Sequence, residues 1–325
     1  MNKSLSLTLT AILTALFLQS CAPSAYKVNS PTPSKYAYTK TSDTAKLELS
    51  FHDGRGEKDK VFSEGTLKAG LLLDKKPIEP ISYIKENTAK ELQARGLNTT
   101  VVEKAPVDIT INKLFIRNYR SNGFSPFITF TMLSADVITP SGKQRVGVYI
   151  KRGKVPVWSF DEVIEPTFNE PLSLVVKELS AKINGITSKQ SISDDQVTKL
   201  AAEINANPAA ADSYLKVYQL GFGFNKTAVK HLVTMSKSAD EYVRLAAISS
   251  LGNLKADGEL SYLKELYNSS TGSWQDRGMA LKAICDIGTA EAMTFAKQAK
   301  ADLDKPSKRD KDDITWTKEI LALYL

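Results

Sequence analysis

Histidine, cysteine and tryptophan are scarce in this chain of 325 residues, which has two, two and three of them respectively. With two histidines and no C-x-x-C pair, the usual ligands of a zinc site cannot be assembled. Two cysteines also cannot form the disulfide framework that holds small secreted domains together. The G-x-x-x-x-G-K-[ST] phosphate loop and the G-x-S-x-G nucleophile motif are both absent. The sequence therefore predicts no metal, no cofactor and no enzymatic activity.

Some residues with catalytic potential have simpler structural interpretations. Cys285 stands alone in an apolar helical pattern, which favours a buried small hydrophobic side chain over a nucleophile. The stretch 221–227 is superficially similar to a phosphate loop, but Asn225 replaces its second glycine, so a turn between helices is the better interpretation. Glu162 and Glu165 form a nominal carboxylate pair for glycoside hydrolysis, the weakest of the functional hypotheses.

The length and charge of the chain favour a protein of two globular domains. The chain has 42% hydrophobic and 24% charged residues, so each domain has enough apolar residues for a core. The formal net charge is +7, with lysines and acidic residues interspersed. Such a balance favours acidic surfaces or lipid headgroups as neighbours and does not indicate nucleic acid binding.

Residues 1–20 have the pattern of an export signal. Lys3 precedes an apolar stretch from Leu5 to Leu18, which is too short to span a bilayer as a helix. The string Leu18-Gln-Ser-Cys21 resembles a lipobox, which implies cleavage before Cys21 and acylation of its sulfur, palmitate included. Ala22 stands where aspartate marks retention at the inner membrane, so the resemblance implies the periplasmic face of the outer membrane. Residues 21–44 are rich in serine, proline and threonine and are predicted to be a flexible tether.

Residues 45–187 are predicted to form a first, α+β domain. Apolar residues alternate in 47–51, 107–111 and 146–150, and 127–138 is dense in strand formers, as expected of a central strand. Helical spacing of apolar residues marks 81–92 and 172–183. We expect an antiparallel sheet with two helices on one face.

The order of these elements resembles the YajG-like family of small bacterial lipoproteins over about residues 21–190. The resemblance depends on the lipobox, the Asp53-Gly-Arg55 turn after the first strand, and the Val-Asp-Ile-Thr-Ile strand at 107–111. It implies a non-enzymatic accessory role in the periplasm. Asp53 and Arg55 are interpreted as a structural ion pair in a turn rather than as a binding contact.

Residues 195–325 are predicted to be helical and to contain a repeat. Arg244, Ala247 and Leu251 recur as Arg277, Ala280 and Ile284, which lie 33 residues further along the chain. The string 243–252, Val-Arg-Leu-Ala-Ala-Ile-Ser-Ser-Leu-Gly, resembles the first helix of a short HEAT-like repeat. The resemblance implies an all-α solenoid of helical hairpins. In it Arg244 and Arg277 would brace the next repeat through an acid such as Asp240 or Asp276, or contact a partner.

Taken together, these features predict an adaptor or assembly factor that is anchored in the outer membrane and binds protein partners of an envelope machine. An auxiliary lipoprotein of lipid or glycan transport is the alternative. That alternative predicts an apolar groove in the first domain, lined by Phe124, Phe127 and Phe130. Nothing in the sequence indicates the oligomeric state.

Overall fold

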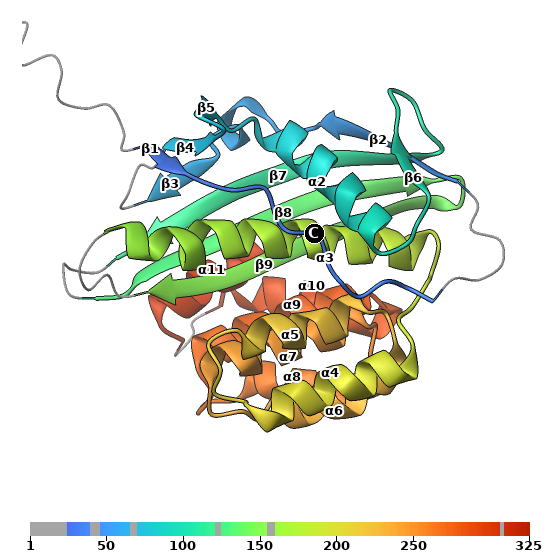
Figure 1. Ribbon diagram of the computed structural model, residues 1–325. Helices are drawn as coiled ribbons and strands as arrows, with labels where there is room; N and C mark the ends of the chain where they lie inside the picture. Colours follow the sequence, from blue (N-terminus) through green and yellow to red (C-terminus); the bar gives the residue numbers. More distant parts are fainter. Residues whose placement is uncertain (1–24, 40–45, 66–69, 121–124, 155–159, 306–308) are drawn as a thin grey trace, which may run out of the picture.

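The computed structural model describes residues 25–39, 46–65, 70–120, 125–154, 160–305 and 309–325. It shows a mixed α/β protein in which a long, twisted main sheet lies above a layered array of helices (Figure 1). The main sheet has six strands, in the order β6-β2-β7-β8-β9, with β3 also beside β7.

The main sheet is mixed, so the predicted antiparallel sheet is wrong in part. β2 (Leu47–Asp53) runs parallel to both of its neighbours, β6 (Thr99–Val101) and β7 (Val107–Tyr119). Only β7, β8 (Phe127–Thr139) and β9 (Gly142–Lys154) form the predicted antiparallel meander, and β3 (Ser63–Gly65) is parallel to β7. The reason is α2 (Pro80–Ala94), which follows β2 and precedes β6. A helical crossover returns the chain so that the next strand runs parallel.

Helices cover both faces of the central strand β8. On one face lies α3 (Glu170–Ile186), and α2 lies beside it against β2 and β6, so both expected helices pack on the sheet. On the other face the Ser134 hydroxyl donates to the Leu323 carbonyl at the C-terminal end of the chain, 2.7 Å away. Burial of both faces explains why apolar residues are so dense in β8. A strand that is buried on one face alternates apolar and polar residues, whereas a strand buried on both faces does not.

The segment predicted to be a flexible tether is ordered over residues 25–39. Val28 and Tyr38 are buried, and their backbone amides donate to the Leu72 and Arg95 carbonyls. The Ser34 amide donates to the Glu91 carboxylate, 2.8 Å away, and that carboxylate forms a buried ion pair with Arg95. The composition of this segment conceals these contacts, because they depend on α2 and on Leu72 rather than on neighbours in sequence.

A small second sheet and several short helical turns complete this half of the molecule. The small sheet has the order β1-β4-β5. Its strands are β1 (Ala25–Lys27), β4 (Gly70–Leu73) and β5 (Lys76–Pro77). The short turns are η1 (Glu57–Asp59), η2 (Phe160–Val163) and the π-helical η3 (Glu165–Asn169).

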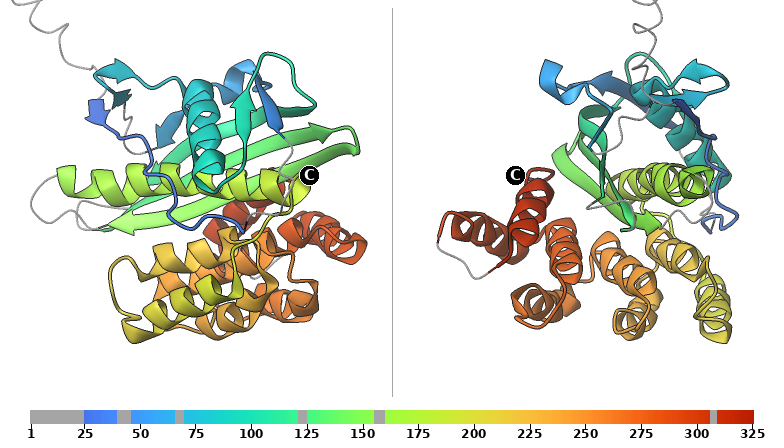
Figure 2. Two further views of the ribbon diagram at one scale, coloured as in Figure 1. Left: turned by 45° about the vertical axis from the view of Figure 1, so that its right-hand side comes forward. Right: turned by 90° about the vertical axis from the view of Figure 1, so that its left-hand side faces the viewer.

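The remaining helices form two layers (Figures 1 and 2). The inner layer packs toward the sheet and consists of α5 (Ser213–Phe222), α7 (Glu241–Asn253), α9 (Trp274–Ile287) and α11 (Lys311–Leu321). The outer layer consists of α4 (Asp194–Ala206), α6 (Val229–Met235), α8 (Leu260–Asn268) and α10 (Ala290–Asp302). The turns η4 (Lys226–Ala228) and η5 (Asp257–Glu259) precede α6 and α8. The inner helices contact α3 and β9, so the row of helices that a solenoid would expose is covered by the chain's own sheet.

Two sets of side chains brace successive inner helices. At their N-terminal ends, the Arg244 guanidinium lies 2.9 Å from the Asp276 carboxylate, and Arg277 pairs in the same way with Asp313. At their C-terminal ends, Lys226 donates to the Lys255 carbonyl, and Lys255 donates to the Asp286 carbonyl. A cation is favourable there because the last carbonyls of a helix carry partial negative charge.

The open edge of the main sheet is also covered by the helices. The Tyr242 hydroxyl donates to the Gly153 carbonyl of β9, 3.1 Å away, and the Tyr324 hydroxyl donates to the Gly147 carbonyl, 3.0 Å away. Unpaired carbonyls on an edge strand invite pairing with another chain, and these contacts prevent it. The apolar core runs without a break from the sheet into the helices. Within the described ranges, every helix is too short or too polar to cross a membrane.

Candidate functional site

An open cleft lies where β7 and β8 approach the first turns of α9 and α11. It is about 1330 Å³ in volume, counted out to its mouth. We call it the tryptophan cleft and define it by Arg117, Tyr119, Ile128, Phe130, Trp274 and Trp316. These residues come from both halves of the molecule, and such junctions are common places for binding sites.

The wall of the tryptophan cleft is a stack of aromatic rings. Phe130 stacks on Trp316 with 3.5 Å between ring centroids, and Trp316 lies nearly parallel to Trp274 at 6.3 Å. Phe130 and Trp316 are buried, whereas Trp274 is half-buried and Tyr119 at the rim is 47% exposed. The buried rings support Trp274, and the exposed parts of Trp274 and Tyr119 are free for contact with a ligand.

Charged groups border the aromatic wall. The Arg117 guanidinium lies 2.7 Å from the Glu319 carboxylate and 2.5 Å from that of Glu64, and its centre is 6.0 Å from the Trp316 ring centroid. Lys311 and Asp312 are exposed at the start of α11. The cleft thus combines an aromatic wall with a rim that carries both signs of charge.

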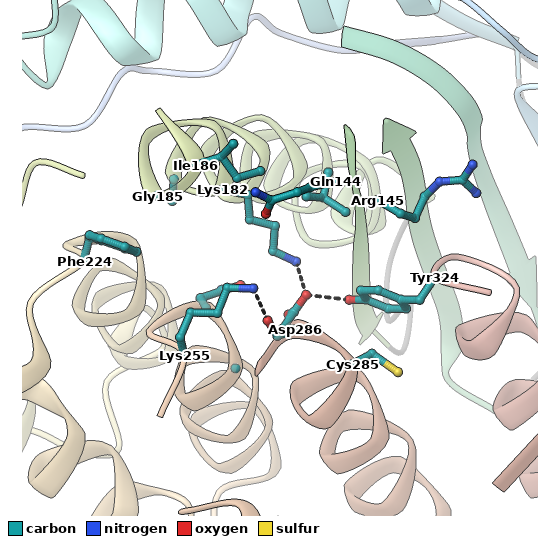
Figure 3. A pocket seen from close by; sticks show the side chains of 14 residues that line it. Gln144, Arg145, Lys182, Gly185, Ile186, Phe224, Lys255, Cys285, Asp286 and Tyr324 are labelled. Atoms are coloured by element: carbon teal, nitrogen blue, oxygen red, sulfur yellow. Dashed lines mark hydrogen bonds and ion pairs between the residues drawn. The ribbon is translucent and has the colours of Figure 1, made fainter. Parts of the chain in front are cut away.

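A second pocket, of about 530 Å³, lies at the junction of α3, β9 and the C-terminal ends of α7 and α9 (Figure 3). In it Lys182 and Tyr324 point at the carboxylate of Asp286, with contacts of 2.6 and 2.8 Å. Lys282 lies 2.8 Å from Asp286 and 2.5 Å from Glu178. We call these five residues the junction network.

The junction network is best interpreted as structural. Burial alone would raise the pKa of Asp286, but Lys182 and Lys282 outweigh it and lower that pKa, so the carboxylate stays charged. Cys285 also lines the pocket, but its sulfur points away and burial raises the pKa of its thiol. A thiol is a poor nucleophile compared with a thiolate. Each charge in this network lies against an opposite one, and the Lys182–Asp286 and Lys282–Glu178 pairs join α3 to α9.

The residues singled out from the sequence lie in different places. Cys21 and Phe124 fall outside the described residues. Arg244 and Arg277 both form braces, and each also donates to carbonyls of the loop before its own helix. Asp53 and Arg55 form the expected turn, with an ion pair of 2.9 Å. The groove predicted to be lined by three phenylalanines is not assembled, because Phe127 packs in the core while Phe130 lies in the tryptophan cleft.

Candidate catalytic groups do not form a recognisable constellation among the described residues. Ser50 and His52 both contact the same oxygen of Asp108, at 2.8 and 2.9 Å. A serine–histidine–aspartate triad instead needs the histidine between the other two. Glu165 accepts a hydrogen bond from Asn169, and within the described ranges no cluster of metal-ligating side chains occurs.

Apart from Phe130, which was assigned to a different groove, the residues of the tryptophan cleft were missed in the sequence. The available signal was weak: two of the three tryptophans lie in the first turn or two of predicted repeat helices. Their juxtaposition with β7 and β8 is set by long-range packing, which no local pattern encodes.

Comparison with known proteins does not identify the chain. No family model matches it, and no curated protein matches it. A solved structure described as "Crystal structure of uncharacterized protein" aligns with 50% of this chain and 97% of its own, at 10% identity and a TM-score of 0.29. Similarity at this level does not establish a shared fold.

Proposed function

We propose that the protein is a non-enzymatic lipoprotein, anchored through Cys21 on the periplasmic face of the outer membrane, that acts as an adaptor for protein partners of an envelope machine. The observation that carries this proposal is the tryptophan cleft. Tryptophan, tyrosine and arginine are the residues most enriched at the energetic centres of protein interfaces. Trp274, Tyr119 and Arg117 provide one of each around a single opening.

The proposal includes the two resemblances seen in the sequence. We take the sheet half to be YajG-like and the helices to be short HEAT-like repeats, four hairpins from α4/α5 to α10/α11. The regular Arg244–Asp276 and Arg277–Asp313 braces support the repeat. Because the inner helices pack on the sheet, the expected partner surface moves from the inner face of the solenoid to the cleft at its end.

Site-specific photocrosslinking of the full lipidated protein in cells tests this function. A photoreactive phenylalanine analogue in place of Tyr119 is expected to give a discrete protein adduct, and the same analogue in place of exposed Lys297 on α10 is expected to give none. Trp274→Ala is then expected to remove the adduct, whereas Phe295→Ala, which truncates an aromatic residue outside the cleft, is expected to leave it. Adducts of equal yield at both positions, or an adduct that survives Trp274→Ala, would refute the adaptor proposal.

One observation supports the alternative function in lipid or glycan transport. A cleft with aromatic faces and a polar rim also suits the binding of a glycan. This alternative predicts that glycan or lipid co-purifies with the soluble portion and is lost in the Trp274→Ala variant. Mass spectrometry of the purified protein distinguishes the two functions, because the adaptor function predicts no bound glycan or lipid.

A further inference from the structure

The ordered N-terminal segment brings the body of the protein close to its predicted anchor. β1 begins at Ala25, four residues after Cys21. Four residues of fully extended chain span at most about 14 Å, because each residue contributes no more than about 3.6 Å. A lipid on Cys21 therefore holds Ala25, the first residue of the small sheet, within that distance of the bilayer surface. A tether of residues 21–44 would have allowed far more freedom.

The small sheet presents one face to the body and one outward. Tyr26 and Leu71 are paired neighbours on the inner face, where Leu71 is buried and the Tyr26 ring stacks on Phe168. Side chains alternate along a strand, so Lys27, Leu72 and Pro77, which are in register across the three strands, lie on the outward face. Leu72 is half-buried and lies outside the set of described apolar residues that pack against the core.

The turn of the β4–β5 hairpin holds a lysine in an unfavourable backbone conformation. Asp74 and Lys75 connect the paired residues Leu73 and Lys76, and their φ angles are 50° and 66°. Positive φ at both central residues is typical of a type I′ turn, in which glycine is preferred at the second position. Lysine there is strained relative to glycine, and the residue is exposed. Strain of this kind recurs at functional positions.

The small sheet also lies at the end of the molecule opposite the outer helices. Figure 1 and both views of Figure 2 place β1, β4 and β5 above the main sheet and α4, α6 and α8 below it. An anchor at β1 thus directs the helical layers away from the membrane.

We propose that the outward face of the small sheet, with Lys27 and Leu72, and the adjoining hairpin turn, with Lys75, rest on the bilayer and bind the phosphate groups of anionic phospholipids. This inference rests on the proposed lipid anchor at Cys21. Exposed lysines next to an apolar side chain suit the boundary between headgroups and acyl chains. Each lysine near an anionic surface strengthens binding by about fivefold. The contact sets the orientation of the protein, with the helices facing the periplasm.

Fluorescence quenching on vesicles tests this orientation. The lipidated protein carries a fluorescent label at Leu72→Cys or, as a control, at Lys297→Cys on α10. Cys285 is buried, and Cys21 is occupied by lipid. Vesicles contain phosphatidylcholine, with or without phosphatidylglycerol, and a lipid with a spin label on its headgroup. We expect the label at position 72 to be quenched at least fivefold more strongly than the label at 297, and more strongly with phosphatidylglycerol than without it.

Charge variants test the part played by the lysines. Lys27→Glu combined with Lys75→Glu is expected to remove the dependence on phosphatidylglycerol, whereas Lys230→Glu combined with Lys297→Glu is expected to retain it. Lys75→Gly, which relieves the turn, is expected to weaken the anionic dependence about fivefold while Lys75→Arg keeps it.

Mass spectrometry of the mature N-terminal peptide tests the lipid anchor at Cys21 separately from the orientation of the protein on the bilayer. An unmodified Cys21 would overturn both the anchor and the orientation. An acylated Cys21 with equal quenching at positions 72 and 297 would overturn the orientation alone.

Discussion

Arg277 of α9 and Asp313 of α11 form an ion pair of 2.8 Å, and each lies three residues from a tryptophan of the cleft. Trp274 precedes Arg277 by about one helical turn, and Trp316 follows Asp313 by the same interval. The brace between the last two inner helices therefore also sets the spacing of the two rings. A residue pair predicted to hold repeats together thus has a second consequence, which is to shape the proposed binding surface.

Removal of this brace is expected to destabilise the protein. In Arg277→Met, the Asp313 carboxylate, 1% exposed, retains the more distant Arg309 at 3.7 Å and a long hydrogen bond of 3.5 Å from the Thr317 hydroxyl. Loss of one partner of a buried pair typically costs about 3 kcal/mol or more. Urea unfolding should show a loss of this size, and Lys264→Met, which breaks an exposed pair with Glu291, should cost less than about 1 kcal/mol. Equal effects of the two variants would contradict the structural role of Arg277.

The two cleft tryptophans are expected to respond differently to truncation. Trp316 is buried against Phe130, with Trp274 beside both rings, so Trp316→Ala should reduce the free energy of unfolding by about 3–5 kcal/mol. Trp274 is half-buried, so Trp274→Ala should affect stability less while it weakens partner binding by about 2 kcal/mol or more. Urea unfolding and the crosslinking yield at position 119 measure the two quantities. A stability loss in Trp274→Ala as large as that in Trp316→Ala would contradict this division.

The junction network is expected to make stability dependent on pH. The pKa of Asp286 is lowered below its ordinary value of 3.8 when the protein folds, because Lys182 and Lys282 outweigh the effect of burial. A group whose pKa is lowered on folding stabilises the folded state above its unfolded pKa. This contribution is complete above about pH 4 and is lost as the pH falls through the lowered value.

The variant Asp286→Asn isolates this contribution. It should lose about 3 kcal/mol at neutral pH, because Lys282 and Lys182 then share the single carboxylate of Glu178. Its unfolding midpoint should also fall less between pH 6 and pH 3 than that of the unmodified protein. A parallel decline in the two proteins would show that Asp286 does not titrate as the structure implies.

Gly147 is expected to be intolerant of a side chain. A Cβ atom built there would lie 2.6 Å from the Tyr324 ring and 3.0 Å from Leu323, so the C-terminal segment would have to move. Overpacking of this kind costs about 1–3 kcal/mol. Gly258→Ala is the control, because a Cβ there meets open space, and a change within about 0.5 kcal/mol is expected. Urea unfolding of Gly147→Ala and Gly258→Ala measures the difference, and equal stability would refute the close packing of the C-terminal segment on β9.

Local features of the sequence were sufficient for much of the secondary structure. The helices α2 and α3 follow from apolar periodicity and the central strand β8 from its density of strand formers, and all three are found where expected. The Arg244 and Arg277 positions follow from the 33-residue interval, and the Asp53–Arg55 turn from a three-residue string. Such signals can be recognised because each depends on residues within one or two turns of chain, or on a repeated spacing.

Only the tertiary structure decided how these pieces combine. Order in residues 25–39 depends on Glu91, Arg95 and Leu72, which are contributed by distant elements, so a composition typical of a tether was misleading. The parallel pairing of β2 depends on the path taken through α2. The tryptophan cleft joins residues near 117, 130, 274 and 316, whose separations in sequence carry no period. Contacts between residues so far apart in sequence depend on how the whole molecule buries its apolar surface. No single segment of the sequence encodes that arrangement.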